Sequence, residues 1–456
     1  MSQLLNNDIV DDVRVDRVVL VLVDCLRFDA YQSSMPNLRR LANEHIEFSD
    51  HHSLGPMTPA SVPALFQSRQ PIEHGGAGMA LREDIPSIAE VLSREGVNTA
   101  GWHSNTYVSA ESGYSRGFDS YVDLGETGTE NDEERSNRGD ISEILARLNL
   151  QSVAESVLDA LKRQGLIQWT NQPDAEEFFD KSMSWMNTGE QEFHYIHLMD
   201  PHFPYFPPAS YRKENSKTLY NLNQLIQDDP SQIDHSELEI LRSTYLQEVS
   251  YVDDRIAEFV DYLRSSGEWD STALVITADH GELFRDKTPP SGMEDITHPS
   301  YCCEELIHVP LVIAGGGIPN NSISKVTSAE DVSPLICDLF GAEIPPEWDR
   351  DELFECPVAV SSSMHQREKG VTISEDFVHI SVRSDQETIL WWSNETPTEY
   401  YHRDNGEERV SHNEIDEKKL HSVCETVSLW ADSIDEQTDI GGEVSERLRQ
   451  LGYVED

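Results

Sequence analysis

Basic residues are scarce in this sequence. Its 456 residues include 34 Lys and Arg against 84 Asp and Glu, which gives a formal net charge of −50. A surface of this sign repels phosphate backbones and anionic lipid headgroups, so the composition argues against a general binder of nucleic acids or membrane surfaces. The acidic residues are spread along the whole chain, and we interpret them as a halophilic adaptation in which counterions screen self-repulsion. An ordinary acidic protein is the alternative.

Paired cysteines and long apolar runs are also missing. The six cysteines form no C-x-x-C pair and have no regular spacing, so neither a disulfide framework nor a zinc site is indicated. The first 17 residues contain four Asp and no apolar core, unlike a secretory signal. The longest aliphatic run, residues 18–23, is far too short to cross a bilayer. We therefore expect a cytoplasmic protein with no membrane span, and the sequence leaves its oligomeric state open.

The sequence does contain strands that alternate with helices. Continuous apolar segments predict buried strands at residues 18–23, 97–102, 192–199, 273–277 and 309–313. Helical spacing of apolar residues occurs over residues 35–47, 85–95 and 238–265. This order predicts an α/β fold, a three-layer α/β/α sandwich with a mainly parallel central sheet.

The composition predicts two parts of unequal size. Residues 1–346 form the predicted catalytic domain, with a polar insertion at about 125–187 and a polar connection at 207–237 that would cover a site. Residues 347–456 form a predicted small C-terminal α+β subdomain. Its expected elements are short antiparallel strands at 371–373, 378–382 and 389–392 and a helical stretch at 423–451.

Carboxylates follow two of the predicted strands directly. Asp24 comes after the run 18–23, and Asp279 and His280 come after the strand that begins at residue 273. In such sheets ligands bind at the carboxyl ends of the strands, and carboxylates placed there suit a hard metal cation. The alternatives are a helix N-cap for Asp24 and a capped turn with an incidental histidine for the second group.

The hydroxyl group of Thr58 lies at the start of a helical run, residues 58–66. The N-terminus of a helix favours a phosphate or sulfate, and a metal bound to the Thr58 hydroxyl would lower its pKa and make it a nucleophile. The alternative is a plain N-cap threonine. Imidazoles close to a transferring anion can donate hydrogen bonds or act as general acids. Candidates of this kind, with a neighbouring amide, are His103, Asn105, His197, His202 and His298.

Taken together, these segments resemble the sulfatase branch of the alkaline-phosphatase superfamily. Seven motifs carry the resemblance, in the expected order, between about residues 18 and 345. They are Asp24-Cys-Leu-Arg27, Pro36 to Ala42, Thr58 to Gly75, Gly117-Phe-Asp119, His197 to Tyr205, Asp279-His-Gly-Glu282, and His298 with Glu304 to Leu311.

The resemblance implies a role for each matching position. One divalent metal, Mn²⁺, Mg²⁺ or Ca²⁺, would be bound by Asp24, Asp279 and His280, with Thr58 as the nucleophile that also touches it. His202 and His298 would hold the anion or protonate the leaving group. Arg27, His103, Asn105 and His197 would contact the substrate, an ester of a small molecule or glycan.

Three departures from the family pattern refine this reading. Thr58 stands where sulfatases carry the Cys or Ser that becomes formylglycine, so a phosphoester is favoured over a sulfate ester. Cys25 replaces an expected second carboxylate. Asp200-Pro-His202 replaces the spaced Asp-x-x-x-His of two-metal relatives, which favours one metal. A phosphoglycerol or phosphoethanolamine transferase, and a non-catalytic binding protein on the same fold, are the alternatives to a hydrolase.

Overall fold

The computed structural model describes most of the first 348 residues and separate segments beyond them. The described ranges are 13–71, 80–127, 173–187, 189–286, 295–299, 301–348, 358–364, 378–385, 387–392, 399–403 and 408–409. The predicted 371–373 strand, the 423–451 helical stretch and most of the 125–187 insertion lie outside them. The division into domains at residue 346 stays a prediction.

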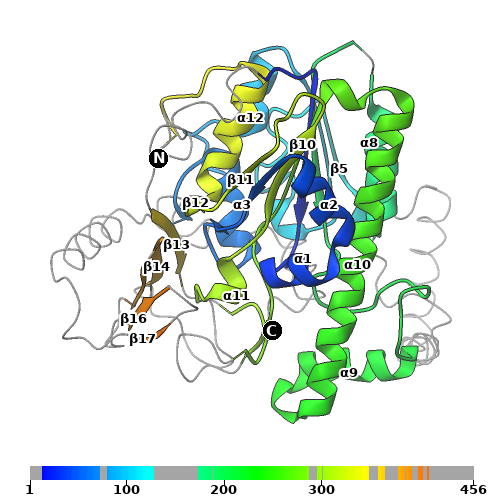
Figure 1. Cartoon of the computed structure of the whole chain (residues 1–456), viewed down its shortest axis with the longest axis vertical. Helices are drawn as coiled ribbons and strands as arrows, with labels where there is room; N and C mark the ends of the chain where they lie inside the picture. Colours follow the sequence, from blue (N-terminus) through cyan, green and yellow to red (C-terminus); the bar gives the residue numbers. More distant parts are fainter. Residues whose placement is uncertain are drawn as a thin grey trace, which may run out of the picture.

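An eight-stranded sheet forms the middle layer (Figure 1). In spatial order its strands are β11 (Asn321–Ile323), β2 (Ile46–Phe48), β10 (Leu311–Gly315), β7 (Thr272–Ala278), β1 (Arg17–Val23), β6 (Glu192–Leu198), β4 (Asn98–His103) and β5 (Ser120–Asp123). The strands from β7 to β5 are parallel to one another, whereas β10 is antiparallel to both β7 and β2. The predicted mainly parallel sheet is confirmed.

Strand β1 explains why the sheet needs a layer on each side. Val19, Val21 and Val23 belong to one hydrophobic core. Val18, Leu20 and Leu22, which alternate with them, belong to a second core. Successive side chains of a strand point to opposite faces, so an unbroken aliphatic run is buried on both faces only between two layers of helices.

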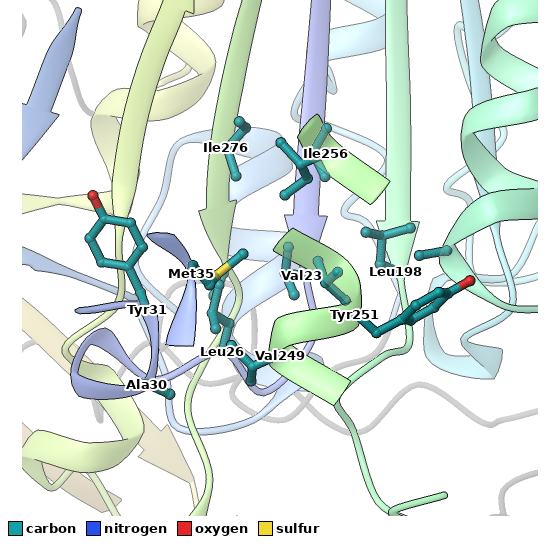
Figure 2. Close-up of a cluster of buried hydrophobic side chains, with 14 of the residues drawn as sticks. Val23, Leu26, Ala30, Tyr31, Met35, Leu198, Val249, Tyr251, Ile256 and Ile276 are labelled. Atoms are coloured by element: carbon teal, nitrogen blue, oxygen red, sulfur yellow. The ribbon is translucent and has the colours of Figure 1, made fainter. Parts of the chain in front are cut away.

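The first core is covered by α1 (Phe28–Ser34), α2 (Pro36–Glu44), α8 (Ala175–Trp185) and the long α10 (His235–Ser266). A capping box of Asp234 and Glu237 satisfies the first amides of α10, and Gly267 ends it with a φ of 82°. Figure 2 shows Val249 and Ile256 of α10 near the β-strand residue Val23. The helix therefore packs over the carboxyl end of β1.

The second core is covered by α3 (Thr58–Gln67), α4 (Ile88–Arg94) and α12 (Val332–Phe340). All ten residues of α3 are buried, and the helix begins at Thr58 with Pro59 in its first turn. The predicted position of Thr58 at a helix N-terminus is therefore confirmed. Among the described residues, no helix combines the length and apolar character needed to cross a membrane.

The polar connection at residues 207–237 is not an irregular loop. It contains α9 (Ser216–Asp228), whose Leu222 and Ile226 join the first core. Asn215 caps this helix by accepting a hydrogen bond from the Thr218 amide. The remaining short elements are β3 (His51–His52), α5 (Leu124–Thr127), β8 (Leu283–Phe284), β9 (Ile296–Thr297), α11 (Glu304–Ile307) and β12 (Thr327–Ser328).

The C-terminal segments form a separate antiparallel sheet. Its strands are β13 (Val358–Met364), β14 (Val378–Ser384), β15 (Glu387–Trp392), β16 (Glu399–His402) and β17 (Glu408–Arg409). Two of the predicted strands fall within β14 and β15, whereas β13, β16 and β17 were not predicted. The Ser362 amide donates to Leu54 O at 2.8 Å, and Ser361 Oγ donates to Ser53 O at 2.6 Å. The small sheet thus holds the loop that leads into α3.

Candidate active site

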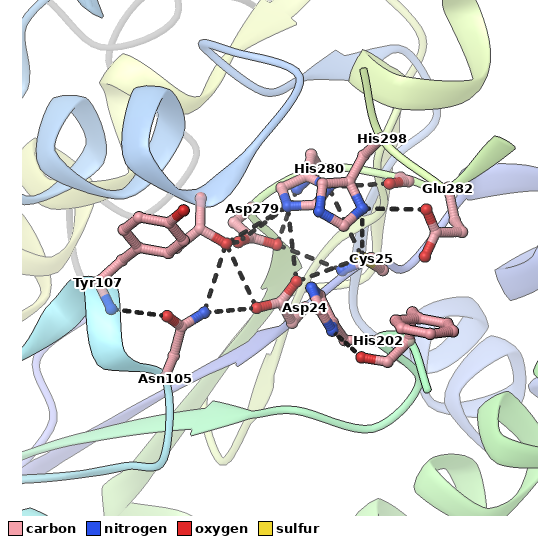
Figure 3. Close-up of polar contacts among 12 residues, drawn as sticks. Asp24, Cys25, Asn105, Tyr107, His202, Asp279, His280, Glu282 and His298 are labelled. Carbon is pink, nitrogen blue, oxygen red and sulfur yellow. Dashed lines mark hydrogen bonds and ion pairs between the residues drawn. The ribbon is translucent and has the colours of Figure 1, made fainter. Parts of the chain in front are cut away.

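The candidate site lies where β1 and β7 end side by side. The two strands are parallel and in register, with Val23 opposite Ala278. The next residues along the chain, Asp24 and Asp279, therefore leave the sheet at the same edge, and both are fully buried. Figure 3 shows Asp24, Asp279 and His280 gathered at this point.

The Thr58 hydroxyl lies at the centre of this group. Its Oγ1 is 2.9 Å from Asp279 Oδ2, 3.4 Å from Asp24 Oδ2 and 3.4 Å from His280 Nε2. Residues 24, 58, 279 and 280 come from three distant segments of the chain. The structure therefore brings together the four residues that the sequence suggested as metal ligands.

The donor set fits a divalent cation. His280 Nδ1 is 2.8 Å from Gly281 O, and because a carbonyl oxygen only accepts, Nδ1 carries the proton. The other nitrogen, Nε2, then offers a lone pair toward the Asp24 and Asp279 carboxylates, each 3.5 Å away. Two buried carboxylates, a hydroxyl and an imidazole are ligands that Mn²⁺, Mg²⁺ or Ca²⁺ accept.

Two buried carboxylates so close to one another need compensating positive charge. Burial raises the pKa of Asp279, and the nearby Asp24 raises it further. Burial would also raise the pKa of Asp24, but His202, His197 and His280 outweigh that effect and hold it well below its usual range. One carboxylate is therefore stabilised as an anion at the expense of the other, a conflict that a bound cation would relieve.

Asn105 and His197 complete the surroundings of Asp24. The Asn105 amide donates to Asp24 Oδ2 at 2.9 Å, and His197 Nε2 lies 3.2 Å from the same oxygen. His103 is one step further out, because its Nδ1 lies 3.0 Å from the backbone oxygen of Asn105 and its ring packs on Tyr121. The structure thus brings Asn105 and His197 into the group, and His103 supports the Asn105 loop.

His202 and His298 lie on the other side of Asp24. Their ring centroids are 5.0 Å apart, and those of His280 and His298 are 4.6 Å apart. Burial lowers the pKa of His202 to about 4. Burial would lower that of His298 too, but the Glu282 carboxylate, 3.0 Å from its Nδ1, raises it. The pKa values of these two imidazoles are therefore shifted in opposite directions.

Arg27 lies apart from this group. Its buried guanidinium binds Asp29 and Asp286 at 2.8 Å each and donates to Glu282 O at 2.9 Å. These contacts tie the start of α1 to the loop after β7, so the side chain is occupied by carboxylates of the protein. The structure does not bring Arg27 into the cluster, and we leave it out of the proposed substrate contacts.

Two residues near the site were not selected from the sequence. Cys25 was regarded only as a lost carboxylate, but its buried Sγ is 3.3 Å from Asp24 Oδ1 and 3.6 Å from His298 Nδ1. Glu282 was part of the Asp279-His-Gly-Glu282 motif and contacts His298 directly. The motif could therefore have identified Glu282 as a site residue. Cys25 could not be identified in this way, because its contact in the site is His298, which is 273 residues away.

Comparisons with known proteins agree with this geometry. The sulfatase family model matches residues 16–342. The low-salt glycan biosynthesis sulfotransferase Agl7 of Haloferax volcanii is 26% identical over 200 residues, which are 39% of this chain and 45% of that protein. The match therefore spans less than half of that relative's length.

Solved structures share the fold over nearly the whole chain. The phosphonate monoester hydrolase of Silicibacter pomeroyi superposes with a TM-score of 0.65 at 18% identity, covering 94% of this chain and 98% of that one. A structure solved with its substrate D-glucosamine-2-N,6-O-disulfate superposes with a TM-score of 0.62 at 14% identity, covering 93% of this chain and 99% of that one. With the family match over most of its length, the chain belongs to the sulfatase family of the alkaline phosphatase superfamily.

Proposed function

We propose that the protein is a metal-dependent phosphoester hydrolase in which Thr58 is the nucleophile. The observation that carries this proposal is the position of Thr58 Oγ1 within 3.4 Å of both Asp24 and His280 and 2.9 Å from Asp279. Sulfatase-family enzymes use a divalent metal. Such an ion, held by Asp24, Asp279, His280 and Thr58, would lower the pKa of the hydroxyl and neutralise charge on the substrate.

The surrounding side chains account for the two proton movements. Thr58 Oγ1 donates to Asp279 Oδ2, which accepts the proton as Oγ1 attacks phosphorus in line. The bond from phosphorus to the leaving oxygen breaks, and His298, whose protonated form the Glu282 carboxylate favours, supplies a proton to that oxygen. Water, which gives a proton to the now neutral His298, then attacks phosphorus; the bond from phosphorus to Oγ1 breaks and Oγ1 takes its proton back from Asp279. Asn105 would hold a remaining substrate oxygen, with His197 and His103 supporting it, and His202 would hold another only when its ring carries both protons.

Threonine at position 58 is the reason for favouring phosphate over sulfate. A threonine side chain cannot be converted to formylglycine, the group with which the related sulfatases cleave sulfate esters. The phosphonate monoester hydrolase that shares the fold supports activity on a phosphorus centre. The substrate-bound structure with a disulfated glucosamine supports a sugar-sized ester as substrate.

The test is cleavage of p-nitrophenyl phosphate, bis-p-nitrophenyl phosphate and p-nitrophenyl sulfate with Mn²⁺, Mg²⁺ or Ca²⁺, in molar KCl. Because the net charge is −50, low salt would itself destabilise the fold. Thr58→Ala should lower kcat about 10⁴-fold or more. Ser61→Ala is the matched control, because Ser61 is a second buried hydroxyl one turn along α3. Unchanged activity in Thr58→Ala would exclude Thr58 as the nucleophile.

A transferase is the second candidate, and the Haloferax volcanii relative, named a sulfotransferase, favours it. The same Thr58 chemistry would then pass the phosphoryl or sulfuryl group to an acceptor alcohol in place of water. Turnover that rises strongly when a glycan or glycerol acceptor is added, with little hydrolysis in its absence, would establish transfer. A non-catalytic protein would neither retain a metal ion nor turn over any ester in this panel.

A further inference from the structure

We propose that Cys25, His202 and His298 form a second cation site that takes a thiophilic divalent ion such as Zn²⁺. Each of these residues offers one ligand atom, and the three atoms lie within 4.8 Å of one another. The residues come from the turn after β1, the segment after β6 and the segment after β9. Figure 3 shows Cys25 and His298 close together beside Asp24, with His202 on the same side.

The spacing matches tetrahedral zinc. With Zn–S and Zn–N bonds of about 2.3 and 2.05 Å at tetrahedral angles, a sulfur and a nitrogen ligand lie about 3.6 Å apart. Cys25 Sγ and His298 Nδ1 are 3.6 Å apart. Glu282 Oε1 is 3.0 Å from the same nitrogen, so a carboxylate is available as a fourth ligand.

Hydrogen bonds present His202 in the form that ligates. Its Nδ1 lies against the backbone oxygen of Phe203, and because that oxygen only accepts, Nδ1 is the protonated nitrogen of the neutral ring. The lone pair then belongs to Nε2. His280 is set in the same way by Gly281 O, so both rings use a backbone carbonyl to fix their tautomer.

The backbone around Cys25 holds the thiol in place. Cys25 has a φ of 62°, a left-handed conformation that is costly for a residue with a side chain. The Tyr245 hydroxyl donates to Cys25 O at 2.8 Å, and the Cys25 amide lies 3.4 Å from Asp279 Oδ1. The thiol is therefore fixed next to two imidazoles, and a soft sulfur ligand with nitrogen ligands selects zinc over magnesium or calcium.

This site lies beside that of the proposed function; the binding of its ion does not depend on that function, whereas the part the ion would play in catalysis rests on it. Asp24 lies between the two, because its Oδ1 is 3.3 Å from Cys25 Sγ and its Oδ2 faces Thr58. Paired ions in phosphoryl-transfer enzymes lie about 3.5–4 Å apart and stabilise the attacking and leaving oxygens. With a second ion bound, that ion would stabilise the leaving oxygen in place of a proton from His298.

The test measures metal stoichiometry and sulfur ligation separately. Apoprotein is loaded with Zn²⁺ and, in parallel, with Co²⁺, then freed of excess metal. Bound metal is counted by elemental analysis, and thiolate-to-cobalt charge-transfer absorption reports sulfur ligation. The variants are Cys25→Ala, His298→Gln and Asp279→Asn. Cys337→Ala is the control, because Cys337 is a buried free thiol of α12 in the second core.

Wild type and Cys337→Ala should bind two equivalents and show the charge-transfer band. Cys25→Ala and His298→Gln should bind one, and Cys25→Ala should lack the band. Asp279→Asn should also bind one but keep the band, because only the other ion is lost. One equivalent in wild type would overturn the proposal, and a band with one equivalent would make Cys25 a ligand of the Asp24–Asp279 ion. No bound metal in any form would contradict both proposals, whereas an inactive protein with two equivalents would contradict the proposed function alone.

Discussion

The two halves of the site share one edge of the sheet but differ in their donor atoms. The oxygen-rich half consists of Asp24, Thr58, Asp279 and His280. The thiol–imidazole half consists of Cys25, His202, His298 and Glu282. The first half suits a hard cation and a nucleophile, and the second suits a softer ion or a proton donor. Asp24 and Cys25 are adjacent in one turn, but they belong to two halves that suit different kinds of cation.

Carboxylates in the two halves respond oppositely to the same burial. Asp279 is buried beside another carboxylate, and its pKa is raised. Burial would raise the pKa of Glu282 as well, but its partner is His298, and its pKa is lowered. The partner, rather than the depth of burial, therefore decides which carboxylate stays charged. The substitutions below test whether the halves also differ in their contribution to activity.

The largest effect is expected in the oxygen-rich half. Asp279→Asn removes a charged metal ligand and the acceptor for the Thr58 proton, so activity should fall about 10³-fold or more and one equivalent of metal should be lost. Steady-state kinetics with elemental analysis measures both. Asp200→Asn is the matched control, because Asp200 is a carboxylate whose pKa burial raises to about 7 but which bonds the Ala175 amide instead of the cluster. Equal losses in the two variants would mean that Asp279 acts only through folding.

A smaller loss is expected in the thiol–imidazole half. Glu282→Gln keeps an acceptor beside His298 Nδ1 but removes its charge, so kcat should fall about 10- to 100-fold while the oxygen-rich half keeps its ion. Glu304→Gln is the control, because Glu304 pairs with His308 at 2.7 Å in the same way outside the site. A loss as large as that of Asp279→Asn would show that the two halves contribute equally.

The oxygen-rich half was predictable from the sequence because its residues follow strands. The register of Val23 with Ala278 places Asp24 and Asp279 together once the strands are recognised as parallel neighbours. The start of a helix placed Thr58 at a helix N-terminus, and the family resemblance supplied its role as nucleophile. In these cases short-range patterns fix both the backbone and the direction of the side chain.

The thiol–imidazole half and Arg27 were harder to predict because they depend on contacts distant in sequence. Cys25 contacts His298, and Arg27 forms an ion pair with Asp286, which is 259 residues away. Strand β13 was missed because its Ser361, Ser362 and Ser363 are polar, yet all three are buried where the sheet docks. Burial of polar residues by such long-range contacts leaves no periodic pattern of apolar residues in the sequence.

His379 in the small sheet is a buried imidazole whose charged neighbour is a cation, unlike His298, which lies beside a carboxylate. His379 lies near Arg383, and burial, reinforced by that charge, lowers its pKa to about 3. Its Nδ1 accepts the Cys302 amide at 2.7 Å, a bond that joins the small sheet to the segment after His298 and that needs an unprotonated nitrogen. His298, beside Glu282, shows the opposite shift.

The smallest effect follows from this shift and appears in stability. Below the unfolded-state pKa of 6.5 the unfolded chain binds a proton at position 379 that the folded protein does not, so stability falls as pH falls toward 3. Moving from pH 7 to pH 5.5 should cost about 1.3 kcal/mol from this residue. His379→Asn, which keeps an acceptor but does not titrate, should flatten the pH dependence of the unfolding free energy by that amount in molar KCl. Parallel curves for wild type and His379→Asn would mean that His379 binds its proton over the same pH range in the folded and the unfolded protein, so that neither burial nor Arg383 lowers its pKa.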